Sequence, residues 1–450
     1  MASARASGYG AGVSQPVKAY HLPGRVATMR LAAGAVEIEV PRLDAGRLRD
    51  VLGAARAAGA TLRTHSRDEV LARLDRVVAN WLDPEHLWRR RALQLLPQAT
   101  GFSAAMVAHG LPLLVEPLRA PAVGALLAAE LGGRTVQAPE LLMHVLSGNI
   151  PGLAMTPVLL SLALQSAVLV KSAAGDPIFP ALLAESIAAV DETLGRCIVV
   201  APWRGGDVAL EAVAFAAADV VVASGSDAAI AAIAPRVPGR FIGHGHKVSF
   251  AAIGAECLAH AADARELAHR LAYDVSLWDQ QGCLSPQLCY VETGGRISPT
   301  RFAELLAESL TRWAHELPPR SLSLAEQVAV LRFRQAAEWA GRGATALLAS
   351  ADGLQWSVSL ESDAIFLPTC LNRCLRLKVI DDLAVLRSAL TPHRRHLEAA
   401  GIATGSHRTA AVTDMLAAAG VHRICEVGMM QRPSLSWRQG GRPRVADWVA

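Results

Sequence analysis

Among the residues able to do chemistry, Cys283 has the local sequence best suited to a nucleophile. It follows Gly282, which permits close backbone approach, and precedes Ser285-Pro286, for which we expect an exposed turn. A cysteine attacks a carbonyl carbon as a thiolate, a form that positive neighbours and helix N-termini favour and apolar cores disfavour. The surroundings of Cys283 therefore fit covalent catalysis, and these residues alone leave a structural role as the alternative.

A second set of polar residues follows apolar runs of strand length, in the segments 147–151, 171–172, 201–203 and 224–226. In a parallel sheet, ligands collect beyond the carboxyl ends of the strands, so these segments are candidates for a cofactor site. No GxGxxG follows any of the runs, and the glycines of residues 8–12 have no strand before them. The usual dinucleotide fingerprint is therefore not supported.

The period of the apolar residues indicates the elements that must position these side chains. From residue 47 to about 118, apolar residues recur every three or four positions, which predicts a helical layer. From residue 141, short apolar runs alternate with segments of helix length, as in the βαβ units of a parallel sheet. The most apolar stretch, 152–170, changes its period midway, so we expect a buried helix and a buried strand, not a membrane span. The predicted fold class is α/β.

The rest of the chain carries weaker signals. Helices are predicted near 261–271 and 301–315. The tail, 423–450, is rich in Arg, Trp, Gly and Pro, which is typical of an irregular surface or a subunit contact. Residues 1–16 are small and polar and lack the apolar core of a signal peptide, so we expect a frayed leader.

Composition and charge limit the classes of function. Of the 450 residues, 52% are hydrophobic and 19% are charged, as in a folded protein with two domains and a small appendage. The net charge of +4 is small and no basic stripe appears, which argues against nucleic-acid binding. The seven cysteines are odd in number and contain no C-x-x-C pair, so they indicate free thiols in a reducing cytoplasm and no metal site. Cys197, which we expect to open a strand, is most simply part of the core.

Four segments, taken in order, resemble the aldehyde dehydrogenase superfamily. They are HVLSGNIPG (144–152), VLVKSAAGDP (168–177), VVASGS (221–226) and WDQQGCLSPQ (278–287). The more detailed resemblance is to the LuxC-type fatty acyl-CoA reductases, which supply aldehyde to bacterial luciferase. It extends from about residue 100 to the C-terminus. It implies an aldehyde dehydrogenase-like fold, with a Rossmann-like cofactor domain and an α/β catalytic domain that carries the nucleophilic cysteine.

The resemblance also implies roles at the reaction centre. Cys283 would attack a thioester carbonyl and form an acyl-enzyme. Asn149 and the Cys283 N–H would stabilise the charge that develops on the carbonyl oxygen, although Asn149 taken alone is simply a turn residue. His244 and His246 are candidates to protonate the aldehyde oxygen, with a plain loop position as the alternative for both.

A cofactor site follows from the same resemblance. Lys171 matches a lysine that contacts the adenosine ribose, and Ser172 lies beside it. Ser224, Gly225 and Ser226 would bind the pyrophosphate, with a helix N-cap as the simpler alternative. Ala174 replaces the glutamate that many NAD-dependent relatives use to hold both ribose hydroxyls. Without that carboxylate nothing opposes a 2′-phosphate, so NADPH is the expected cofactor.

Two departures from the superfamily pattern concern the chemistry itself. Hydrolytic aldehyde dehydrogenases use a Glu-Leu-Gly-Gly motif to activate water, but the matching residues 242–247 contain no acid. A reductase must keep water from its acyl-enzyme, so this absence favours reduction. In addition, Ala364 replaces a glutamate that contacts the nicotinamide ribose, and Glu361 or Asp363 are the candidates to substitute for it.

We therefore expect residues 1–245 to form N-terminal helices and an NADP-binding domain, 246–400 a catalytic domain, and 401–450 a segment that returns to the cofactor domain or a subunit interface. The expected reaction takes an acyl-CoA or acyl-carrier-protein thioester with NADPH to aldehyde, thiol and NADP. One alternative is an oxidising or acyl-phosphate-reducing member of the superfamily. Another, of a different class, is a cofactor-free acyltransferase or acyl-binding protein. The resemblance further implies a homo-oligomer, a dimer or tetramer.

Overall fold

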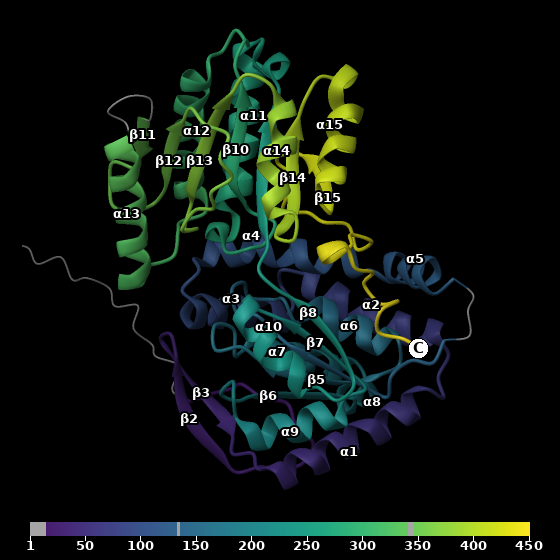
Figure 1. The fold of residues 1–450 in the computed structure, drawn as a ribbon. Helices are drawn as coiled ribbons and strands as arrows, with labels where there is room; N and C mark the ends of the chain where they lie inside the picture. Colours follow the sequence, from purple (N-terminus) through teal and green to yellow (C-terminus); the bar gives the residue numbers. More distant parts are fainter. Residues whose placement is uncertain (1–14, 133–135, 341–345) are drawn as a thin grey trace, which may run out of the picture.

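The computed structural model describes residues 15–132, 136–340 and 346–450 (Figure 1). Residues 1–14 of the predicted leader, with the glycines of 8–12, lie outside them. A first parallel sheet has the strand order β6-β5-β4-β7-β8. Its strands are β4 (Leu141–Val145), β5 (Ala167–Ser172), β6 (Ile198–Pro202), β7 (Val220–Ser224) and β8 (Arg240–His244). The predicted alternation of strands and helices from residue 141 is therefore confirmed.

Both faces of this sheet are covered by helices, which explains why its strands are apolar throughout. On one face, α1 (Ala45–Leu62) and α9 (Val208–Ala217) pack against Leu169 and its neighbours. On the other, α6 (Met155–Ala163) and α7 (Phe179–Val190) pack against Val168. The stretch 152–170 thus contains a buried helix and the start of a buried strand, as its change of period predicts.

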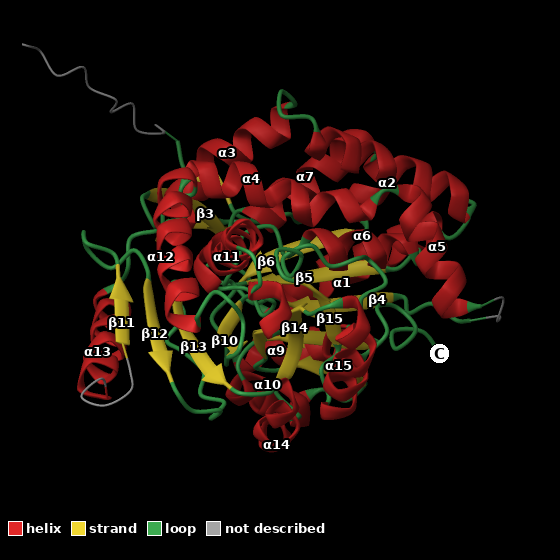
Figure 2. Cartoon of the chain, turned by 90° about the horizontal axis from the view of Figure 1, so that it is seen from above, coloured by secondary structure: helices red, strands yellow, loops and turns green. Residues whose placement is uncertain are grey.

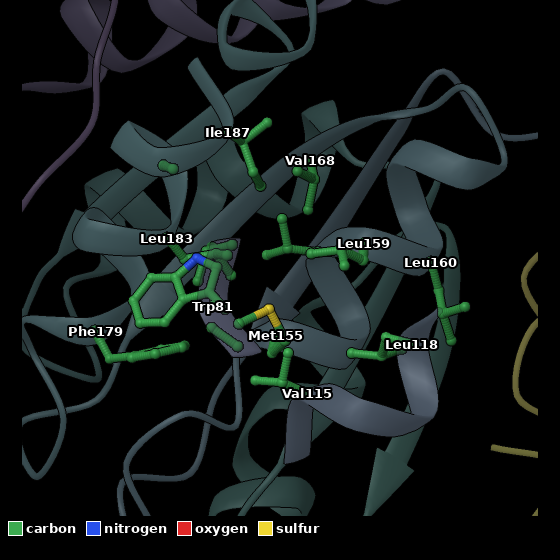
Figure 3. Packing of buried hydrophobic residues seen from close by; sticks show 14 of the residues in the cluster. Trp81, Val115, Leu118, Met155, Leu159, Leu160, Val168, Phe179, Leu183 and Ile187 are labelled. Atoms are coloured by element: carbon green, nitrogen blue, oxygen red, sulfur yellow. The ribbon is translucent and has the colours of Figure 1, made fainter. Parts of the chain in front are cut away.

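The helices predicted from residue 47 to about 118 do not form a single layer, because α1 lies on the face of the first sheet opposite to α6 and α7. The helices after α1 pack outside α6 and α7. They are α2 (Arg67–Leu82), α3 (Leu87–Thr100) and α4 (Ala104–Val115), and α5 (Ala120–Leu131) follows beyond the predicted range. A capping box between Ser66 and Glu69 begins α2, and near its end Trp81 is fully buried. The Trp81 ring lies 5.1 Å from that of Phe179 (Figure 3). Trp81 Nε1 donates to Ser186 Oγ at 2.8 Å. These contacts join α2 to α7, the helix that covers this face of the first sheet.

A second sheet of seven strands forms the upper part of the molecule in Figure 1, in the order β11-β12-β13-β10-β9-β14-β15. Only the β11–β12 pair is antiparallel among these described strands. The strands are β9 (Val248–Ile253), β10 (Pro286–Glu292), β11 (Ala346–Ala349), β12 (Ser357–Glu361), β13 (Cys374–Ile380), β14 (Leu397–Ala403) and β15 (Arg423–Glu426). On one face lie α11 (Ala261–Ser276) and α12 (Pro299–Glu316), and on the other α14 (Leu386–Leu390) and α15 (Ser406–Ala419) (Figure 2).

Three α-helices and a small sheet complete the described elements apart from short 3-10 turns. They are α8 (Glu192–Arg196), α10 (Asp227–Ile233), α13 (Leu324–Ala340) and a three-stranded sheet of β1 (Val17–Lys18), β2 (Thr28–Ala33) and β3 (Val36–Pro41). The prediction that Cys197 opens a strand is wrong by one residue, because Cys197 is the C-cap of α8 and β6 begins at Ile198. Its side chain is buried, as expected.

The tail after β15 is irregular, as expected, but it lies only partly on the surface. Met430 and Val445 are fully buried, and Val445, Trp448 and Val449 join the hydrophobic core beside the first sheet. The tail runs from the second sheet down to the first (Figure 1). In the described ranges no single helix is long and apolar enough to cross a membrane; one pair, α3 and α4 with its 3-10 extension to Leu118, passes by length and composition but is bent by 118°.

Candidate active site

Cys283 lies three residues before β10, at the amino end of this central strand of the second sheet. A short 3-10 segment, Leu277–Gln280, precedes it. The expected exposed turn at Ser285-Pro286 is wrong. Ser285 is 1% exposed and Pro286 is the first residue of β10. The turn is covered by a segment that is remote in the sequence, because Gln431 of the tail donates from Nε2 to Ser285 Oγ at 2.8 Å.

The backbone before Cys283 has a conformation that non-glycine residues rarely adopt. Trp278, Asp279 and Gln280 have φ values of 56°, 50° and 62°. Such a conformation persists only where the surroundings stabilise it. Here a buried ion pair joins Asp279 to Arg373 at 2.7 Å, and the Asn372 N–H donates to the Asp279 carbonyl at 3.1 Å. Segment 372–373 therefore stabilises the loop that precedes Cys283.

The surroundings of Cys283 favour its neutral form. Burial, followed by the charge of Glu398, raises the pKa of the thiol to about 12, while Arg444 and Lys247 act in the opposite direction. In the free protein at neutral pH the sulfur is thus a thiol. A reaction that needs the thiolate must remove the proton as the sulfur attacks.

Asn149 lies against the Cys283 loop, although 132 residues separate it from Gln281. Its Nδ2 donates to the Gln281 carbonyl at 2.6 Å, and its Oδ1 is buried without a partner in the described part of the chain. The Asn149 loop is anchored by Asp176, which accepts from the Gly152 N–H at 3.2 Å. A β-carbon at Gly148 would come within 2.9 Å of the Gly175 backbone, so this close approach requires glycine.

Several polar side chains gather at the carboxyl ends of β5 and β6. The ammonium of Lys171 lies 5.7 Å from the centre of the Trp203 ring, and burial lowers the pKa of Lys171. Ser172 Oγ and Trp203 Nε1 are buried and have no hydrogen-bond partner among the described residues. Ala174, three residues beyond Lys171, is exposed. This edge therefore offers unused donors to a polar ligand.

Segment 224–226 lies at the next part of the same edge. Ser226 is the N-cap of α10, because its Oγ accepts from the Ala229 N–H at 3.2 Å. Gly225 donates its N–H to the His244 carbonyl at 3.1 Å, which places this segment directly beside the end of β8. The simpler N-cap alternative is thus observed for Ser226, and it leaves Ser224 and the Gly225 backbone beside His244.

The two histidines differ in their surroundings. Burial, followed by the charges of Arg444 and Arg442, lowers the pKa of His244 to about 4, so its ring is neutral at pH 7. His246 is exposed, and its ring lies 6.4 Å from that of His396. Arg444 influences both His244 and Cys283, which indicates that these two lie near the same guanidinium.

The candidate substitutes for the missing glutamate at position 364 are both engaged in ion pairs. Glu361 pairs with Arg376 at 2.6 Å and with Lys378 at 2.5 Å, and Asp363 also pairs with Lys378. Neither carboxylate is therefore free to accept from a ribose hydroxyl without giving up a cation.

Sequence reasoning missed two charged groups beside Cys283. Glu398 is fully buried near the start of β14, and Arg444 stacks on Trp437, with 4.8 Å between the guanidinium carbon and the ring centre. The signal for Glu398 was a single acid within the apolar run 397–403. For Arg444 the sequence offered no signal beyond the basic character of the tail.

A family model described as acyl-CoA reductase (LuxC) matches residues 62–442. The chain belongs to this family. Among curated LuxC-like relatives, the long-chain acyl-protein thioester reductase of Photorhabdus luminescens is 29% identical over 294 residues, which are 64% of this chain and 58% of that protein. The reductase of the same name from Vibrio harveyi is 26% identical over 292 residues. The chain thus matches less than two thirds of the length of these relatives.

Solved structures agree with the fold that the LuxC resemblance implies. Aldehyde dehydrogenase 21 from Physcomitrella patens superposes with a TM-score of 0.75 at 14% identity and covers 97% of each chain. The NADP-dependent glyceraldehyde-3-phosphate dehydrogenase of Bacillus halodurans gives a TM-score of 0.76 at 12% identity, over 97% of this chain and 98% of that one. The predicted aldehyde dehydrogenase-like fold is confirmed.

Proposed function

We propose that this protein reduces an acyl thioester to an aldehyde through an acyl-enzyme on Cys283. The observation that carries the proposal is the hydrogen bond of Asn149 to Gln281, which brings a side-chain amide to the residue two positions before Cys283. The relatives' names, long-chain acyl-protein thioester reductases, support a thioester as the class of substrate.

The steps assigned to the chain follow from these positions. Cys283 Sγ attacks the thioester carbonyl carbon, the bond from that carbon to the donor sulfur breaks, and the donor leaves as its thiol. The carbonyl oxygen becomes negative during attack. Asn149 Nδ2, released from the Gln281 carbonyl, and the Cys283 N–H are the two donors that stabilise it.

A nicotinamide cofactor fits the carboxyl ends of the strands of the first sheet, where Ser172 Oγ and Trp203 Nε1 are buried and have no partner in the part of the chain that the structure describes. Lys171 and Ser172 would bind the adenosine ribose and its 2′-phosphate, and segment 224–226 the pyrophosphate. The bound cofactor supplies the hydride that reduces the acyl group. His244, neutral at pH 7, would hold a ring N–H toward the product oxygen, and the exposed His246 would exchange protons with solvent.

Mass spectrometry of the intact protein, mixed with acyl-CoAs and acyl-carrier thioesters without NADPH, tests this function. We expect one acyl group per chain, on Cys283, and release of aldehyde when NADPH is then added. Aldehyde oxidation in the absence of any thioester reaction would support the oxidising alternative. Acylation without any NADPH binding in calorimetry would support the cofactor-free acyltransferase.

Ala174→Glu is expected to reverse the cofactor preference. Ala174 is exposed near Lys171, so a carboxylate there would oppose a 2′-phosphate and weaken NADPH binding by on the order of 1–3 kcal/mol. NADH should be spared or bound better, because the carboxylate can accept both ribose hydroxyls. Titration calorimetry with each cofactor measures the ratio.

Lys171→Ala is the companion variant with the opposite sign. It should cost NADPH more than NADH, since the cation interacts more strongly with the more highly charged cofactor. A wild-type preference for NADH, or an unchanged ratio in Ala174→Glu, would mean that the adenosine ribose binds elsewhere.

A further inference from the structure

Glu398 is a buried carboxylate with an unused oxygen. The residue is 0% exposed, its Oε1 accepts from the Gly440 N–H at 2.9 Å, and its Oε2 has no hydrogen-bond partner in the described ranges. Buried carboxylates are costly and are normally fully paired. An orphaned carboxylate oxygen inside a protein therefore calls for a functional explanation.

The position of Glu398 relates it to Cys283. The Ser249 hydroxyl donates to the Cys283 carbonyl at 2.6 Å and accepts from the Ala399 N–H at 3.0 Å. One side chain thus joins the Cys283 backbone to the residue after Glu398. Cys283 also packs against a small apolar cluster that contains Ala399, the residue after Glu398.

Two cations and one backbone N–H act on the Glu398 carboxylate. Burial raises its pKa, while the Gly440 N–H, Lys247 and Arg444 lower it. Glu398 is, after burial, the largest cause of the raised pKa of the Cys283 thiol. Because the pKa of the thiol lies well above 7, few molecules carry the thiolate at neutral pH. Attack by a preformed thiolate would therefore be rare.

We propose that Glu398 is the proton acceptor and donor for Cys283, an inference that rests on the function proposed above. As Sγ attacks the acyl carbon, the S–H bond breaks and its proton passes to Glu398 Oε2. The bond from the acyl carbon to the donor sulfur then breaks, and the same proton moves from Glu398 to that sulfur, which leaves as a thiol. Atoms and charge balance, and Glu398 is again a carboxylate.

Glu398→Gln tests this role, with Glu256→Gln as the matched control. Glu256 also accepts a backbone N–H, that of Gly405 at 2.7 Å, but it lies beyond the opposite end of β14. We expect Glu398→Gln to slow acylation of Cys283 by about 100- to 10,000-fold, the range of general-base catalysis, and Glu256→Gln to leave it within about threefold of wild type. Mass spectrometry on quenched samples measures the rate.

Alkylation by iodoacetamide supplies a readout that a structural role would not move. Iodoacetamide reacts with the thiolate, so the pH dependence of the alkylation rate reports the pKa of the thiol. Removing the Glu398 charge should shift the alkylation profile of Cys283 to lower pH even as thioester acylation slows. An acylation rate within threefold of wild type in Glu398→Gln, or an alkylation profile that does not shift, would overturn the proposal.

If Glu398→Gln does not fold, the pH dependence of acylation in the wild-type protein tests the role of Glu398 instead. The wild-type acylation rate should rise with one ionisation and level off well below the pKa of the thiol. A rate that keeps rising about tenfold per pH unit into alkaline solution would show attack by free thiolate and exclude a base. If no thioester acylates wild-type Cys283, the proposed function itself falls; normal wild-type acylation with an unaffected Glu398→Gln removes only the role of Glu398.

Discussion

Cys283→Ala is expected to abolish acyl-enzyme formation and aldehyde production while leaving NADPH affinity nearly unchanged. The substitution removes the atom that forms the thioester. It should not disturb cofactor binding, because Lys171 and Ser172 belong to the first sheet, whereas Cys283 precedes β10 of the second sheet. Intact-protein mass spectrometry and titration calorimetry measure the two properties separately.

Cys289→Ala is the control for this variant. Cys289 is six residues further on, but it is fully buried within β10, and burial raises the pKa of its thiol. Its alanine variant should retain most of the activity. Full activity in Cys283→Ala, or acylation that moves to Cys289, would rule out the mechanism.

Asn149→Ala should lower the rate of acylation by about a hundredfold or more, because one lost oxyanion donor costs a few kcal/mol of transition-state stabilisation. The single-turnover rate with a thioester measures the effect. Thermal unfolding should show that the variant remains folded, since the loop is also anchored by Asp176. A decrease of less than about threefold would reduce Asn149 to a turn residue.

Asn372→Gly separates the donor role of Asn149 from simple support of the Gln281 segment. Asn372 also contacts Gln281, as the acceptor of its Nε2 at 3.0 Å, and its φ of 56° suits glycine. Loosening Gln281 from that side should slow acylation by less than about tenfold. An equal loss in both variants would mean that the position of the Gln281 segment, and not the amide donor, limits the rate.

The sequence by itself determined the alternation of helices and strands in the first half of the chain. Periodicity is a local property: Val168 and Leu169 face opposite helical layers, and their run is apolar because both faces are covered. For the same reason the residues that end each strand, among them Lys171 and Ser224, could be identified in advance, since the carboxyl ends of parallel strands share one edge.

The tertiary structure alone decided the surroundings of Cys283. The Ser285-Pro286 turn looks exposed from its own residues, yet Gln431 buries it from 146 positions away. In the sequence Glu398 resembles an ordinary strand residue. In the structure the Gly440 N–H of the tail binds one of its carboxylate oxygens, and the other has no partner among the residues described. Burial and charge at a site depend on which segments, remote in the sequence, pack there. Local composition does not predict those contacts. The reactive state of a cysteine depends on that packing.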